Sequence, residues 1–399
     1  MTGYVQMHFS RTEREKIFNG EWNDWPADEW DEYSDCLDIT EDSETNATIS
    51  EIIKPRFKVD NVDGILDDDT HIRFESIIEF PHFLLHTLRV FVELYDVSLK
   101  KDLGDLLDDK KLIADFENVI KYGTIDDEPI KDNKENFAKR FIIHLLQTRY
   151  LFDMFIIKRE FTGEDKEGEW SLKEVHTSGQ ASKKKAYYSN TKLRYENEWE
   201  KTYAPRNKEC LMIQSALRVS YTSPKVMHWI TELILWLFED NKIAELTNEA
   251  EGIAAKATKE NFLDGEDYKL GVTTPHIVFN FLDYLLWKNN KNTYSDFEFE
   301  FRNSVEHWYP QNSSDGSFDS WEDRDTFGNL CIISRSVNSK FSNLSPESKM
   351  KSYSKMVKKG SLKLRIMGGI IQNSSNEVWI DSKCQEHENE MISILKKSV

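Results

Sequence analysis

Four residues in the last quarter of the chain have the types and the order that phosphodiester hydrolysis requires. Glu306 and His307 are adjacent, and Asn329 and Asn338 follow them on either side of a short hydrophobic run. A histidine that titrates near neutrality can remove the proton of an attacking water. Magnesium prefers oxygen ligands and keeps several waters, so that one or two protein oxygens suffice. We therefore predict a one-metal phosphodiesterase, with Glu306 and Asn338 as metal ligands and His307 as general base.

Two further residues of this stretch, Pro310 and Asn329, are expected to position the base. Adjacent residues of a strand point to opposite faces, so Glu306 and His307 need a strand end or a bend to converge. Pro310 is well placed to enforce that bend. Asn329 follows Gly328 at the entry to a second strand, and its side-chain amide can bridge the loop that carries His307. We expect Asn329 to orient the imidazole.

Charge is distributed unevenly along the chain, and this bears on nucleic-acid binding. The formal net charge is −19, which opposes contact with a polyanion. Residues 21–45 hold eleven of the acids and no Lys or Arg, whereas residues 335–365 hold nine basic residues and one acid. A basic patch therefore begins inside the suspected site. The side chains expected to bind phosphate are Arg335, Lys340, Lys349, Lys351 and Lys355.

Hydrophobic periodicity predicts a mainly α protein with a C-terminal α+β domain. Apolar residues recur at helical spacing between residues 75 and 291, which indicates one helical domain. After residue 291 the period changes, and we place an α+β domain over residues 292–399. Its predicted elements are strands at 297–301 and 329–334, a basic helix at 346–359 and a closing helix at 386–397.

The first 74 residues form an acidic N-terminal arm that we expect to be partly ordered. Four large aromatic residues interrupt its acids, at Trp22, Trp25, Trp30 and Tyr33. Two interpretations remain open. The first is a solvated, poorly ordered segment. The second is an acidic-aromatic docking element for a partner protein, which is supported by the cost of leaving tryptophan exposed without a use.

The sequence argues against several other classes of protein. Its four cysteines lie far apart and form no C-x-x-C pair, which disfavours a structural zinc site or a disulfide framework. The N-terminus lacks a basic-then-apolar signal, and charged or polar residues interrupt the most apolar stretch, 141–157. We therefore expect a cytoplasmic protein that does not interact with a membrane.

The motif Glu306-His-x-x-Pro-Gln, followed by Gly328-Asn-Leu and Asn338-Ser-Lys-Phe-Ser-Asn, resembles the signature of the HNH, or ββα-metal, nucleases. The helical pattern before it, with Leu145-Leu-Gln-Thr-Arg-Tyr-Leu-Phe-Asp153, is similar to that of GmrSD-type modification-dependent restriction proteins. The resemblance covers about residues 75–399. It implies a helical domain followed by an HNH nuclease domain, with Mg²⁺ or Mn²⁺ held by Glu306 and Asn338, His307 as base and Asn329 as brace.

The resemblance also implies a substrate and a partner. Members of that family cut DNA, including modified phage DNA, in bacterial defence against foreign DNA. They begin with a nucleotide-hydrolysing module marked Asp-Gly-Gln-Gln-Arg, which is absent here. We therefore expect a separate nucleotide-hydrolysing partner subunit. The alternative interpretation is a non-catalytic partner-binding subunit with an HNH-like scaffold, favoured by the net charge and by the large helical portion without evident chemistry.

Overall fold

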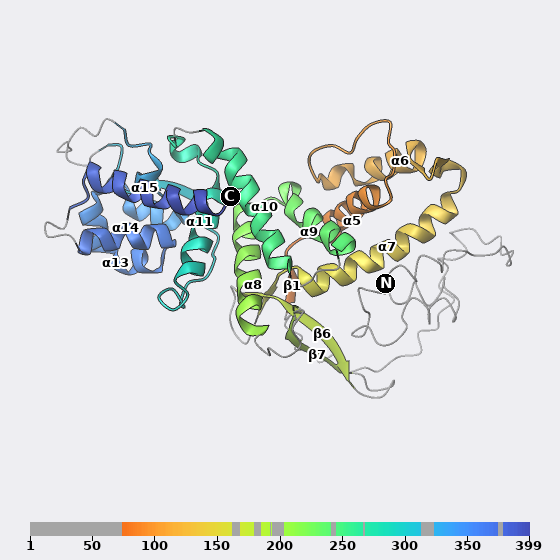
Figure 1. The fold of residues 1–399 in the computed structure, drawn as a ribbon, viewed down its shortest axis with the longest axis horizontal. Helices are drawn as coiled ribbons and strands as arrows, with labels where there is room; N and C mark the ends of the chain where they lie inside the picture. Colours follow the sequence, from red (N-terminus) through yellow and green to blue (C-terminus); the bar gives the residue numbers. More distant parts are fainter. Residues whose placement is uncertain are drawn as a thin grey trace.

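A computed structural model describes residues 74–161, 168–178, 185–191, 193, 203–240, 245–265, 268–312, 323–373 and 378–399. The acidic arm, apart from its last residue, lies outside the described residues. Within them the chain is mainly helical, and its strands form small sheets of two or three strands. The predicted fold class, mainly α with a C-terminal α+β region, is confirmed. Figure 1 shows the C-terminal elements at one end, α5, α6, α7 and α9 at the other, and α8 and α10 between them.

The N-terminal helices bury apolar faces, and residues at their first turns mark where two of them begin. Helix α5 (Phe80–Leu94) has a proline in its first turn, where the missing N–H costs nothing. Helix α7 (Lys134–Phe155) is capped by the side chain of Asn133, which accepts a hydrogen bond from Asn136 N. The other helices of this part are α6 (Leu112–Tyr122), α8 (Tyr203–Ser220), α9 (His228–Asp240) and α10 (Leu246–Asn261), with 3-10 turns at Asp109–Lys111, Ile130–Asp132, Pro224–Val226 and Leu263–Gly265.

Three small antiparallel sheets accompany these helices. Strand β4 (Lys158–Glu160) lies between β1 (Phe74–Ser76) and β5 (Glu169–Ser171). The segment after α7, which its composition predicts to be a loop or a small ribbon, contains the two-stranded ribbon of β6 (Lys173–Ser178) and β7 (Lys185–Asn190). A tight hairpin joins β2 (Thr124–Ile125) to β3 (Glu128–Pro129).

Helix α11 (His276–Asn289) connects the helical part to the C-terminal part. Its residues from Ile277 to Trp287 are all buried, since it packs against α8 and α10 on one side and against α14 (Leu362–Gln372) and α15 (Asp381–Lys397) on the other. One hydrophobic core accordingly extends from the N-terminal helices to Leu395. The domain boundary at residues 291/292 stays a prediction, and it falls just after this shared helix.

The C-terminal part contains the elements that position the candidate site. Strands β8 (Ser304–His307) and β9 (Leu330–Ile333) pair antiparallel, and α12 (Arg335–Phe341) and α13 (Pro346–Lys359) follow, with 3-10 turns at Gly271–Thr273 and Phe327–Asn329. The second strand, the basic helix and the closing helix are confirmed. The strand predicted at 297–301 is wrong. Phe297 and Phe299 are buried and Phe301 is exposed, but this extended segment has no pairing partner among the described strands.

Candidate active site

Strands β8 and β9 and helix α12 form a compact ββα unit that carries Glu306, His307 and Asn338, and Asn329 lies in the 3-10 turn just before β9. Glu306 lies opposite Cys331 in the strand register, and His307 lies opposite Leu330. Helix α12 starts two residues after β9, where the hydroxyl of Ser334 caps it by accepting a hydrogen bond from Val337 N. The amide of Asn338 donates to the hydroxyl of Ser304 over 2.6 Å, which fixes α12 against the first strand.

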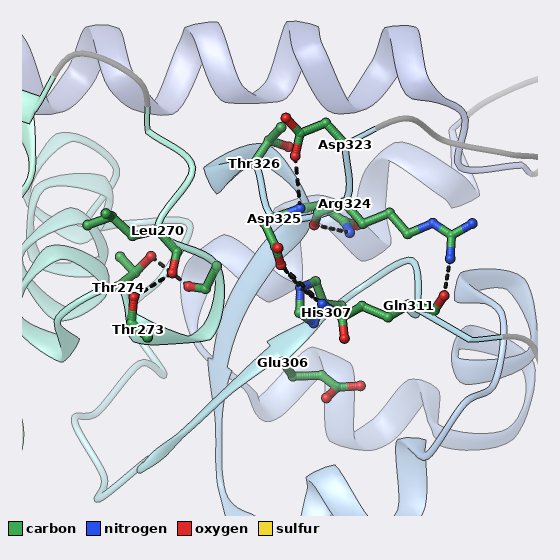
Figure 2. A network of polar contacts seen from close by, with 12 residues as sticks. Leu270, Thr273, Thr274, Glu306, His307, Gln311, Asp323, Arg324, Asp325 and Thr326 are labelled. Carbon is green, nitrogen blue, oxygen red and sulfur yellow. Dashed lines mark hydrogen bonds and ion pairs between the residues drawn. The ribbon is translucent and has the colours of Figure 1, made fainter.

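His307 is held by a carboxylate that the sequence pattern does not reveal. Its Nε2 lies 2.7 Å from Oδ1 of Asp325, and its side chain is 9% exposed. The amide of Gln311 donates to the same carboxylate oxygen over 3.2 Å. Figure 2 shows the imidazole directed toward Asp325, while the side chain of Glu306 leaves the strand in another direction. Asp325 was missed because it is one of several acids in a polar loop, and nothing in the sequence shows which of them reaches His307.

Glu306 forms a buried ion pair. Its Oε1 lies 3.0 Å from the ammonium of Lys349, which is fully buried, and the Glu306 side chain is 13% exposed. The same ammonium donates to the carbonyl oxygens of His307 and Trp308 over 2.8 and 3.0 Å. Burial lowers the pKa of Lys349, and the neighbouring carboxylate of Glu306 opposes that shift. Since Glu306 and Ser304 are two residues apart on β8, Glu306 faces the side on which Asn338 lies.

The position of Lys349 corrects its expected role. Its buried ammonium holds the end of β8 and cannot reach a DNA backbone on the surface. The spacing of charged residues along a helix does not show which lysine points into the protein core. The other four residues expected to bind phosphate, Arg335, Lys340, Lys351 and Lys355, are exposed on α12 and α13.

Asn329 is fully buried and braces the loop that follows His307. Its Oδ1 accepts a hydrogen bond from Tyr309 N over 2.8 Å, and its Nδ2 donates to the carbonyl oxygens of Tyr309 and Arg324, each over 3.0 Å. Its carbonyl also accepts from Trp308 N over 2.8 Å. The amide therefore ties the segment after β8 to the segment before β9, and no hydrogen bond joins it to the imidazole.

We expect Asn329→Ala to lower the free energy of unfolding by about 1–3 kcal/mol, because it strips a buried N–H and two carbonyls of their partners. Urea unfolding followed by tryptophan fluorescence measures this change. Asn261→Ala is the matched control, since that exposed amide bonds only its own helix. Equal stability of the two variants would mean that the amide does not support the loop.

The glycine before Asn329 is required by close packing. A Cβ at Gly328 would lie 2.4 Å from the carbonyl oxygen of Cys384 on α15, nearer than any real contact. The N–H of Gly328 donates to Glu388 Oε2 over 2.7 Å.

A second buried lysine, Lys363 of α14, donates to the carbonyls of Phe327 and Leu330 over 2.7 and 2.6 Å. Burial lowers the pKa of this lysine to about 8. Both strands are therefore fixed to the helices by buried ammonium groups.

The donor chemistry at Glu306 and Asn338 fits magnesium or manganese rather than a soft metal. Both side chains offer oxygen, and Asn338 uses its nitrogen for Ser304, which leaves its oxygen for another partner. Among the described residues no group of three or more His, Cys, Asp or Glu could hold a metal. A site here would therefore depend on one carboxylate, one amide and several waters.

Comparison with known protein families identifies the C-terminal part of the chain. Residues 257–394 match the family model described as the C-terminal domain of GmrSD restriction endonucleases. No curated protein and no solved structure matches the chain. The matched range contains α11, the ββα unit and the helices that carry the two buried lysines. Among the described helices, none has the length and apolar character needed to cross a membrane.

Proposed function

Because residues 257–394 match the family model of the C-terminal domain of GmrSD restriction endonucleases, we propose that this chain is the metal-dependent DNA-cutting component of a bacterial restriction system. The observation that carries the proposal is the order of residues on the ββα unit. A carboxylate and a histidine end the first strand, a buried asparagine braces the loop, and an amide follows on the helix. This is the arrangement that the resemblance to HNH nucleases implies.

The metal and the base would act on the same phosphodiester at the end of β8. Glu306 and Asn338 would hold Mg²⁺ or Mn²⁺, which when bound neutralises charge on the phosphoryl oxygens and the leaving oxygen. His307, on the other face of β8, would take the proton of the attacking water. One phosphodiester must reach both the metal and the base, so the reaction requires Glu306 and His307 to converge at the end of β8 when DNA is bound. Exposed Arg335 and Lys340 on α12 would bind neighbouring phosphates.

The test of metal dependence uses plasmid nicking by the purified chain, with a candidate partner subunit if one is encoded alongside. We expect nicking with Mg²⁺ or Mn²⁺, none with a chelator, and loss of activity in Glu306→Gln. Glu300→Gln is the matched control, because Glu300 lies in the extended segment just before β8 with its side chain 72% exposed. Undiminished nicking by Glu306→Gln would remove Glu306 from the proposed site.

A non-catalytic scaffold is the second candidate, and the ion pair between Glu306 and Lys349 favours it, because an ammonium already neutralises the expected metal ligand. Calorimetric titration with Mn²⁺ separates the two. The nuclease proposal predicts binding by the wild type that Asn338→Ala removes and that Asn261→Ala retains. The scaffold predicts no binding in any of the three.

We further propose that a separate nucleotide-hydrolysing subunit controls cleavage, and that the DNA recognised includes modified phage DNA. The resemblance to GmrSD-type proteins, whose members carry a nucleotide-hydrolysing module, supports this proposal. Co-expression with the product of a neighbouring gene that carries the Asp-Gly-Gln-Gln-Arg motif tests the idea. Cleavage that rises only when the partner and a nucleoside triphosphate are both present would support it.

A further inference from the structure

The carboxylate of Asp325 is the strongest feature of the site that neither the motif nor the family match assigns. Its Oδ1 lies 2.7 Å from Nε2 of His307, a short distance typical of a charge-assisted hydrogen bond. The carboxylate is 49% exposed, whereas the imidazole is 9% exposed. Asp325 therefore lies between solvent and the buried histidine.

The contact decides which ring nitrogen of His307 is available for chemistry. An ionised carboxylate only accepts hydrogen bonds, so the ring nitrogen that faces it carries the proton. The amide of Gln311 donates to the same oxygen and so reinforces its role as acceptor. Nδ1 of His307 forms no hydrogen bond with the residues that the structure describes. A neutral imidazole that donates from Nε2 to Asp325 has its lone pair at Nδ1, where it could accept a hydrogen bond from a water or a substrate.

A segment of the helical part fixes the backbone of Asp325. The 268–271 segment connects α10 to α11 and runs beside the loop that precedes β9. Gly271 N donates to the carbonyl of Asp325 over 3.2 Å, and Phe327 N donates to the carbonyl of Tyr268 over 3.0 Å. A 2.5 Å ion pair joins Lys269 to Asp323. These contacts fix the backbone on both the N-terminal and the C-terminal side of Asp325.

Gly271 shows how closely this segment approaches the carboxylate. Its φ of +54° is the left-handed conformation that favours glycine, and a Cβ there would lie 2.8 Å from Oδ1 of Asp325. Figure 2 shows the neighbouring residues of this turn, Leu270 to Thr274, beside the loop of Asp325. A side chain at position 271 would push the carboxylate away from the imidazole. The turn is therefore shaped around Asp325.

We propose that Asp325 is a positioning residue that holds His307 with Nδ1 directed to the attacking water, and that the 268–271 segment sets the position of Asp325. This rests on the proposed function, since it assigns a partner to the general base. The role is orientation: the carboxylate fixes the tautomer and the ring plane, and it exchanges no proton with the substrate. The helical part of the chain thereby contributes to the geometry of the base.

The test compares Asp325→Ala, Asp325→Asn and Gly271→Ala with the matched control Asp296→Asn, whose carboxylate is exposed and pairs with Arg365. Nicking kinetics give kcat and KM. We expect Asp325→Ala to lower kcat by at least about tenfold with little change in KM. The loss should be smaller than the roughly 10⁴-fold loss seen for a fully buried orienting carboxylate, because Asp325 is half exposed. Asp325→Asn retains an accepting oxygen and should recover part of the rate. Gly271→Ala should resemble Asp325→Ala, and Asp296→Asn should match the wild type.

A second measurement does not depend on cleavage. Nitrogen NMR of histidine-labelled full-length protein, with His307 assigned by its loss in His307→Gln, reports the tautomer directly. We expect Nδ1 of His307 to be unprotonated in the wild type and a mixed tautomer in Asp325→Ala. An unchanged tautomer in Asp325→Ala, or an unchanged kcat, would overturn the positioning role. Failure of the wild type to cut DNA under any condition would instead refute the proposed function, while the tautomer would still decide the role of Asp325.

Discussion

Replacing His307 with alanine is expected to lower the rate of DNA nicking by about 10²- to 10⁴-fold, the usual contribution of a general base. The imidazole ends β8, its Nε2 is bonded to Asp325, and its other nitrogen is left for water. Gel-based nicking of supercoiled plasmid under single-turnover conditions measures the rate. Circular dichroism and thermal unfolding of the same preparation establish that the fold is intact.

Chemical rescue separates loss of a base from loss of structure. The alanine variant leaves a space of imidazole shape beside Asp325, so added imidazole is expected to restore part of the nicking rate. Added imidazole should not rescue Glu306→Gln, whose defect concerns the metal. If His307→Ala nicks DNA as fast as the wild type, His307 is not the base and the proposed mechanism fails.

Of the ββα unit, strand β9 could be predicted because its signal is local, whereas the first strand was expected at 297–301 and the helix at 346–359. Ser345 and the proline after it mark the start of α13, and β9 is a run of apolar residues that follows a Gly-Asn pair. The order of Glu306, His307, Asn329 and Asn338 needs only the sequence. Helix α14 was not predicted, because Gly368 and Gly369 interrupt an already short pattern. Gly368 is there because a Cβ would lie 2.7 Å from a methyl group of Val357.

The remaining parts of the site depend on contacts between distant residues, which no local pattern reports. Asp325 reaches His307 only because the 268–271 segment and Asn329 hold the loop between the strands. The alternation at Phe297 and Phe299 reflects one buried face of an extended segment that has no neighbouring strand to pair with among the described strands. Burial of a charge is the hardest feature to foresee, because it depends on partners that become available only in the folded chain. Lys349 is the clearest case.

Lys349→Met is expected to lower the free energy of unfolding by about 3–5 kcal/mol, the usual effect of removing one partner of a buried ion pair. Methionine has a similar volume, so the loss comes from electrostatics rather than from a cavity. The change leaves the Glu306 carboxylate and the carbonyls of His307 and Trp308 without their shared donor. Denaturant unfolding measures the stability, and nicking assays report whether the end of β8 keeps its geometry.

Lys351→Met is the matched control, because Lys351 lies two residues along α13 on its exposed surface. Its removal should leave stability within about 0.5 kcal/mol of the wild type. If α13 contacts the DNA backbone, Lys351→Met should weaken DNA binding and reduce its salt dependence by about one charge. Lys349→Met is expected to have no direct effect on DNA binding, since the ammonium of Lys349 is buried away from any phosphate. An equal loss of stability in both variants would contradict the inward role of Lys349. A loss of DNA affinity in Lys349→Met with full stability would restore its original assignment as a phosphate ligand.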